Sequence, residues 1–290
     1  MDRVKQSYIY AGLAVFFWST IPTVFKIGLG ELDIIPMLTI ASFTSTLVLF
    51  LIVVAGKKFE LLKKTSGKDL LISALLGLIN PFIYYIILLE AYKLLPAQVA
   101  QPLNMIWPII LVFLSVPVLK QKIPAKSFAA LFISFAGVYI ISSQGQPLHP
   151  GKSDTAGVLL ATGSSVFWAM YFIFNMKDKR DESVKLFTNF LFASVYLLFA
   201  ILIFGDPRPA ISFKGAAASV YVGIFEMGIT FFFWLKALRL AITSDKVSNL
   251  VYLAPFLSLV FVHFIIKEPV YYTTPAGLLL IIAGIIIQNR

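Results

Sequence analysis

The sequence has 290 residues, of which 59% are hydrophobic and only 13% charged, with a mean hydropathy of +0.89 and a formal net charge of +10. These fractions lie far outside those of soluble globular domains, so they predict an all-α integral membrane protein. Because the chain has no cysteine, disulfides and thiolate metal sites are excluded.

The apolar residues fall into ten blocks, eight of 20 to 24 residues and two of 15 and 16. About 20 residues cross a ~30 Å hydrocarbon core at ~1.5 Å per residue. The predicted spans are residues 8–29, 35–55, 70–92, 97–119, 127–142, 155–175, 184–204, 215–238, 247–266 and 274–288. The first block is too long for a signal peptide, so we expect it to be retained. The connections are too short for a soluble catalytic domain, and we therefore expect the protein to act within the bilayer.

The basic residues are distributed unequally between the two sides of the membrane that the predicted spans define. Of the 24 Lys and Arg, eighteen fall on the side of the N-terminus, five on the opposite side and Lys26 within the first span. The positive-inside rule then predicts a multi-pass protein of the cell (inner or plasma) membrane with both termini in the cytoplasm. The basic excess is interpreted as a topology signal, helped by anionic lipid of the bilayer, and no nucleic-acid partner is expected.

The two halves of the chain resemble each other at nearly constant offsets. The matching pairs are Phe17-Trp18 with Phe167-Trp168, Ser73 with Ser219, Gly77 with Gly223, Asn80 with Glu226, Pro108 with Pro255, Lys120 with Lys267, and Ala136-Gly137 with Ala283-Gly284. These offsets predict two repeats, residues 1–145 and 146–290, which together form one transport domain. Five spans per repeat invert the second copy, as in many secondary transporters whose substrate binds near the midplane.

The ten spans, the FFWS motif (16–19) in span one with VFWA (166–169) in span six, and Ala-Gly near the ends of spans five and ten resemble the EamA-type members of the drug/metabolite transporter superfamily. The resemblance covers the whole chain and implies transport of small metabolites, often amino acids, through a central cavity. The family commonly carries Gly-Glu after spans four and nine. This sequence departs from it, with Lys120-Gln121 and Lys267-Glu268.

Glu226 is the most conspicuous candidate for substrate binding. It lies about midway along span eight, where an ionised side chain costs about 2.5 to 3.5 kcal/mol and needs a compensating partner. Helical spacing puts Ser219, Gly223 and Thr230 on its face, and Asn80 is its counterpart in span three. The alternative is structural: small residues that pack closely, with Asn80 and Glu226 hydrogen-bonded across helices.

Lys26 shares a face of span one with Trp18 and Pro22. Its ammonium group can extend to the membrane interface, or it can form an ion pair with Glu226. Alternatively, Lys26 and Glu226 lie on opposite sides of a cavity, where a zwitterionic substrate would bind to both charges. Burial also favours the neutral carboxyl of Glu226, so proton coupling is a further hypothesis.

Aromatic side chains complete the predicted site because their rings can stack on an organic solute or bind a cation. The candidate substrate-binding residues are Glu226, Asn80, Lys26, Trp18, Tyr84, Trp168, Tyr252 and Trp107.

No catalytic residue, cofactor or metal site is expected, since neither His149 nor His263 has a suitable partner in sequence and no H-E-x-x-H occurs. We therefore expect a secondary transporter of small organic metabolites that works by alternating access around a midplane cavity between the repeats. Amino acids or their derivatives are favoured, and export follows by family analogy alone. The alternatives are nucleoside-like or other cationic metabolites, a passive channel, and a membrane scaffold or sensor. The oligomeric state, monomer or homodimer, stays open.

Overall fold

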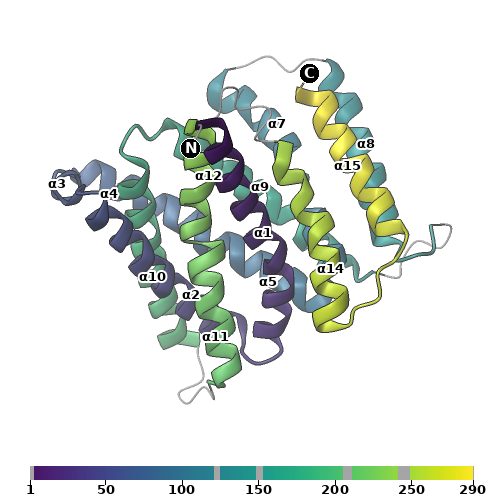
Figure 1. The fold of residues 1–290 in the computed structure, drawn as a ribbon, viewed down its shortest axis with the longest axis horizontal. Coiled ribbons are helices and arrows are strands. Elements are labelled where there is room, and N and C mark those ends of the chain that lie inside the picture. Colours follow the sequence, from purple (N-terminus) through teal and green to yellow (C-terminus); the bar gives the residue numbers. More distant parts are fainter. Residues whose placement is uncertain (1–2, 121–124, 148–152, 205–210, 241–248, 290) are drawn as a thin grey trace. The chain divides into compact units, whose positions relative to one another are not determined.

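The computed structural model describes residues 3–120, 125–147, 153–204, 211–240 and 249–289 (Figure 1). Regular structure within these residues is helical throughout, which confirms the all-α prediction. The elements are α1 (Arg3–Leu29), α2 (Ile34–Ala55), α3 (Phe59–Lys63), α4 (Gly67–Gly77), η1 (Leu78–Ile83), α5 (Tyr84–Leu94), α6 (Ala97–Asn104), α7 (Trp107–Leu119), α8 (Ala125–Ser142), α9 (Thr155–Lys177), α10 (Glu182–Phe204), α11 (Phe213–Tyr221), η2 (Val222–Glu226), α12 (Ile229–Leu240), η3 (Asn249–Leu253), α14 (Ala254–Ile266) and α15 (Thr273–Asn289).

Seven helical stretches of the described chain are long and apolar enough to cross a membrane. They are Arg3–Leu29, Ile34–Ala55, Gly67–Leu94, Ala97–Val118, Thr155–Lys177, Glu182–Phe204 and Phe213–Trp234. Shorter apolar helices lie at Lys126–Ser142, Ala254–Ile266 and Thr273–Ile287, where the fifth, ninth and tenth spans are predicted. The start of the predicted ninth span lies outside the described residues. The protein is therefore a multi-pass membrane protein, and the count of ten spans stays a prediction.

Four of the predicted spans are not continuous α-helices within the described residues. The described part of span nine begins with the 3-10 helix η3 and continues as α14. Span three divides into α4, η1 and α5, and span eight into α11, η2 and α12. Span four divides into α6 and α7 at Met105 and Ile106, immediately before Pro108. Proline supplies no backbone N–H, so the helix is interrupted ahead of Pro108 and restarts with the proline in its first turn.

Contacts divide the chain into two compact units that interleave along the sequence. Unit 1 comprises Met1–Phe82 and Arg180–Ile266, and unit 2 comprises Ile83–Lys179 and Lys267–Arg290. Each unit thus contains segments from both halves of the sequence. One of the three places where the chain passes between the units lies inside span three, at η1.

Unit 1 is built around α1 and α2. The α1 helix runs antiparallel to α11 and α12, since the Ser7 hydroxyl donates to the Ala237 carbonyl (2.7 Å) while the Thr20 and Tyr221 hydroxyls lie 2.8 Å apart. The α2 helix packs on α10 through a buried hydroxyl cluster in which Ser194 lies 2.9 Å from both Ser42 and Thr46. Because these buried hydroxyls satisfy one another, the helices can pack closely around them.

Two glycines let backbones approach in unit 1. A methyl group at Gly77 would overlap the carbonyl oxygen of Asn189 in α10, and one at Gly223 would overlap that of Ala41 in α2. Gly77 directly precedes η1 in span three, and Gly223 is the second residue of η2 in span eight. The packing of each interrupted helix therefore depends on the missing side chain.

In unit 2 the most extensive contact joins α8 and α15. A methyl group at Gly137 would lie 2.5 Å from the Gly277 carbonyl oxygen, and the reciprocal distance is also 2.5 Å. The α9 helix packs on α5, with Gly157 against the side chains of Leu94 and Leu95. Small residues thus determine the distance between helices here too. This is expected in a membrane, because the hydrophobic effect does not favour helix association in lipid and close packing must do so instead.

Two matched lysines adopt a left-handed backbone conformation. Lys120 follows α7 with φ 57°, and Lys267 follows α14 with φ 60°. Glycine adopts this conformation without a steric cost, whereas other residues pay about 1–2 kcal/mol. The family that the sequence resembles commonly has glycine at these two positions. The left-handed backbone explains why glycine is favoured there.

Replacing either lysine by glycine is expected to stabilise the protein by about 1 kcal/mol, because the left-handed strain is removed. Thermal denaturation of Lys120→Gly and Lys267→Gly in detergent measures this. Lys126→Gly, in the first turn of α8, is the matched control and should lower stability, since glycine is a poor helix former. If all three variants lose stability alike, the conformational explanation is wrong.

Candidate functional site

Asn80 interrupts span three. Its backbone is extended (φ −146°, ψ 125°) within η1, and its peptide bond to Pro81 is cis. The side chain is 1% exposed, and its Oδ1 atom has no hydrogen-bond partner among the described residues. A buried polar atom without a partner is costly and points to a ligand, a water or a second conformation. Asn80 is therefore a suitable contact for a bound solute.

Glu226 ends the corresponding interruption in span eight. The π-turn η2 is closed by the Met227 N–H, which donates to the Val222 carbonyl (3.1 Å), and the Ser45 hydroxyl of α2 donates to the Met227 carbonyl (2.9 Å). The Glu226 side chain is half-buried. Single π-turns are frequent at functional sites because they shift side chains out of α-helical register.

The two interruptions thus occur at the positions that the sequence pairs with each other. Discontinuous helices in corresponding places of two halves point to the binding site of a transporter. Here span three leaves helical geometry at Asn80, whereas span eight keeps it and contains a π-turn that ends at Glu226. Neighbouring hydroxyls satisfy part of this backbone: the Tyr196 hydroxyl donates to the Ala74 carbonyl (3.1 Å) ahead of the first interruption, as Ser45 does beside the second.

Lys26 and Trp18 lie at different levels of unit 1. The antiparallel register of α1 places Trp18 beside α12, where its ring centroid is 5.4 Å from that of Trp234. The ring of the neighbouring Phe17 stacks on that of Phe225, 4.3 Å away, so Glu226 lies at the level of Trp18. Lys26 lies two helical turns farther along α1, about 12 Å. It is half-buried, as Glu226 is.

Unit 2 brings three of the predicted aromatic residues together. The ring of Trp168 lies 5.0 Å from that of Tyr84 and 6.4 Å from that of Trp107. The sequence analysis missed Asn104, which accepts a hydrogen bond from the Tyr84 hydroxyl (3.2 Å) and donates to Ser164 (2.8 Å). An amide three residues before Trp107 inside an apolar span was the signal that could have identified it. The side chain of Tyr252, also predicted, lies outside the described part of the chain.

The acid that follows span nine has a structural partner. Both carboxylate oxygens of Glu268 accept from the Ala97 N–H (3.2 and 2.9 Å) at the start of α6. Beside it, the fully buried Gln98 accepts from the Tyr271 N–H (3.0 Å) and the Thr274 hydroxyl (3.1 Å). Glu268 thus occupies a helix N-terminus, where a negative charge is favoured. Its predicted counterpart Gln121 lies outside the described residues.

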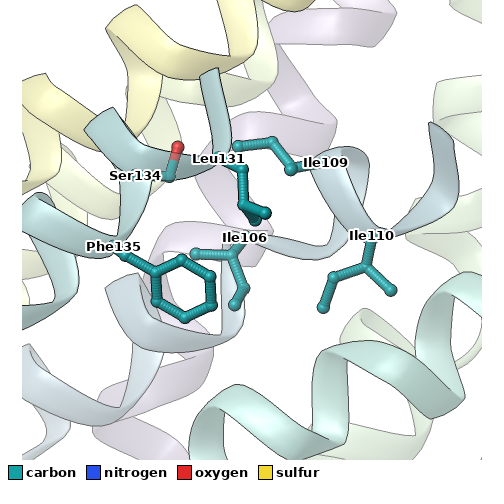
Figure 2. A pocket seen from close by; sticks show the side chains of 6 residues that line it. All are labelled: Ile106, Ile109, Ile110, Leu131, Ser134 and Phe135. Atoms are coloured by element: carbon teal, nitrogen blue, oxygen red, sulfur yellow. The ribbon is translucent and has the colours of Figure 1, made fainter. Parts of the chain in front are cut away.

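A recess in unit 2 is lined almost entirely by apolar side chains (Figure 2). Its residues are Ile106, Ile109, Ile110, Leu131, Ser134 and Phe135. None of these is a predicted site residue, and a pocket for a polar metabolite needs several convergent polar groups. We therefore do not assign substrate binding to it.

Comparison with known proteins agrees with this picture. The chain is 26% identical to an uncharacterized transporter of Clostridium kluyveri, over 98% of this chain and 93% of the relative. It is 28% identical to the uncharacterized transporter YvbV of Bacillus subtilis over 83% of the chain and 78% of the relative. A solved crystal structure with 17% identity superposes with a TM-score of 0.67, covering 98% of this chain and 96% of the other. That likeness shows the fold alone.

The helical fold, its apolar spans and these relatives define a membrane transporter. The EamA-like transporter family matches residues 5–143 and again residues 155–290, and the chain belongs to that family.

Proposed function

We propose that the protein is a ten-span secondary transporter of small organic metabolites that works by alternating access around a midplane site. Amino acids and their derivatives are the favoured substrates, and export from the cell is the favoured direction. The observation that carries the proposal is the pair of interrupted helices, with Asn80 at one interruption and Glu226 at the other. In this proposal both termini lie in the cytoplasm.

Repeat-related contacts support two inverted five-helix repeats at residues 1–145 and 146–290. Gly77 packs on span seven as Gly223 packs on span two, and Lys120 and Lys267 share one unusual backbone conformation. The three shorter apolar helices complete ten spans. Duplication accounts for these correspondences, and two similar halves can expose one site to either side in turn.

The charges suggest the substrate class. The Glu226 carboxylate would bind a substrate ammonium, the Asn80 amide a polar group, and Lys26 a substrate carboxylate, which together suit a zwitterion. If Lys26 and Glu226 instead pair with each other, their side chains must extend toward one another across the separation of about 12 Å along α1, and the empty site is then neutral. Glu226 can also exchange a proton during the cycle, which would couple transport to the proton gradient.

The aromatic clusters favour a second candidate, a nucleoside-like or other cationic metabolite. The rings of Trp18 and Trp234, and those of Tyr84, Trp107 and Trp168, offer faces for stacking or for a cation. A passive channel and a scaffold are the remaining alternatives.

Counterflow in proteoliposomes tests the proposal. Vesicles loaded with an unlabelled amino-acid mixture should accumulate labelled amino acid transiently and saturably, because alternating access exchanges solute across the membrane. A parallel set loaded with nucleosides tests the second candidate. Flux that rises linearly with concentration and shows no counterflow would indicate a channel. Absence of any response to a pH gradient would exclude proton coupling but leave exchange intact.

A further inference from the structure

The segment between α2 and α4 carries a dense cluster of basic residues. Residues 57–69 contain five lysines against Glu60 and Asp69. The lysines are Lys57, Lys58, Lys63, Lys64 and Lys68, and all except Lys58 are exposed. Glu60 forms an exposed ion pair with Lys63 (2.9 Å), which solvent weakens. The segment therefore presents a net positive surface.

Two contacts hold this segment at the end of unit 1. Lys58 forms an ion pair with Asp181 (2.8 Å), just before α10, and the ring of Phe59 packs edge-on against that of Phe50 in α2 (6.3 Å). Burial raises the pKa of Asp181, but hydrogen bonds from Lys58 and Ser183 outweigh it, so the carboxylate stays ionised and paired. The α3 helix is thus fixed beside the ends of α2 and α4 (Figure 1).

The position of α3 puts its side chains at the membrane boundary. The α2 helix has no charged residue and ends at Ala55, four residues before α3 begins. With five residues α3 is too short to cross the bilayer, yet Phe59 is 43% and Leu61 47% exposed. Exposed apolar side chains among lysines just outside the hydrocarbon are typical of segments that bind in the interfacial plane.

We propose that residues 57–68 form a docking surface for anionic phospholipid headgroups of the adjoining leaflet. Lys57, Lys63, Lys64 and Lys68 contact the phosphates, while Leu61 inserts among the upper acyl carbons. Charge complementarity selects this partner, since juxtamembrane lysine clusters are attracted to anionic leaflets. Transport activity is not required for this interaction, which makes it independent of the proposed function.

The absence of cysteine from the chain allows a direct test. Leu61→Cys, labelled with an environment-sensitive fluorophore, is reconstituted into vesicles of phosphatidylcholine alone or mixed with phosphatidylglycerol. The emission should shift to shorter wavelength only with the anionic lipid. High salt should reverse the shift, because the Debye length falls from about 10 Å at 0.1 M to about 3 Å at 1 M.

A charge-matched pair of triple variants identifies the residues responsible. Lys57→Gln/Lys63→Gln/Lys64→Gln in the labelled protein should lower the docking equilibrium constant on the order of 100-fold, at about fivefold per lysine. The control Lys5→Gln/Lys126→Gln/Lys179→Gln removes three exposed lysines from the same predicted side and should keep the shift. Equal emission in both lipids, equal loss in both variants, or the same shift with inorganic phosphate in neutral vesicles would overturn the proposal. Thermal denaturation confirms that both variants are folded.

Discussion

Glu226→Gln is expected to weaken binding of a substrate ammonium by at least about tenfold and to abolish measurable counterflow, because a hydrogen bond to a charged group contributes about 1.5–3 kcal/mol. The substitution keeps the shape of the side chain and removes only its charge. Substrate-induced thermal stabilisation of the purified protein measures binding, and counterflow measures transport. The interruption of span eight, where Ser45 holds the Met227 carbonyl, should be unchanged.

Glu60→Gln is the matched control, since it neutralises an exposed carboxylate on α3 and should leave binding unaffected. The double variant Asn80→Asp/Glu226→Gln moves the carboxylate to the corresponding interruption, and partial recovery of binding would show that both interruptions face the same solute. Should Glu226→Gln bind every substrate as the native protein does, the carboxylate has no role in binding. Retained exchange without a response to pH would assign it to proton coupling instead.

Gly77→Ala and Gly223→Ala are expected to destabilise the protein by at least about 1–3 kcal/mol each, because the added methyl group meets a backbone carbonyl rather than a movable side chain. Asn189 and Ala41 carry those carbonyls within α10 and α2. The overlap between the added methyl group and the carbonyl oxygen can be removed only if a whole helix moves. Thermal denaturation in detergent, and protein yield in membranes, measure the loss.

Gly12→Ala in α1 and Gly163→Ala in α9 are the controls, because nothing lies within 4 Å of the added methyl group at either position. Both should be neutral or gain up to about 1 kcal/mol from the higher helix propensity of alanine. Equal stability of Gly77→Ala and Gly12→Ala would show that span three does not approach α10 as closely as described.

The sequence pairs Asn80 with Glu226 but does not contain the backbone geometry at either residue. The structure places an irregular helical segment at each of these paired positions, η1 at Asn80 and η2 at Glu226, and the apolar pattern of the two spans contains no sign of either. The irregular segment of span eight depends on neighbours distant in sequence, such as Ser45, whose hydroxyl donates to the Met227 carbonyl at the end of the π-turn. Pro81 was a local signal for one interruption, whereas Glu226 has no proline beside it.

The sequence by itself determined the membrane setting, the family resemblance and the approximate spans, because the length and hydropathy of an apolar block are local properties. It also located the two lysines after spans four and nine, but not their left-handed backbone. Tertiary structure alone decided that Asn104 joins Tyr84 and that α1 places Trp18, rather than Lys26, level with Glu226. Only tertiary structure, too, divided the chain into units that interleave its halves. These features arise from contacts between segments up to 230 residues apart, which no local pattern encodes.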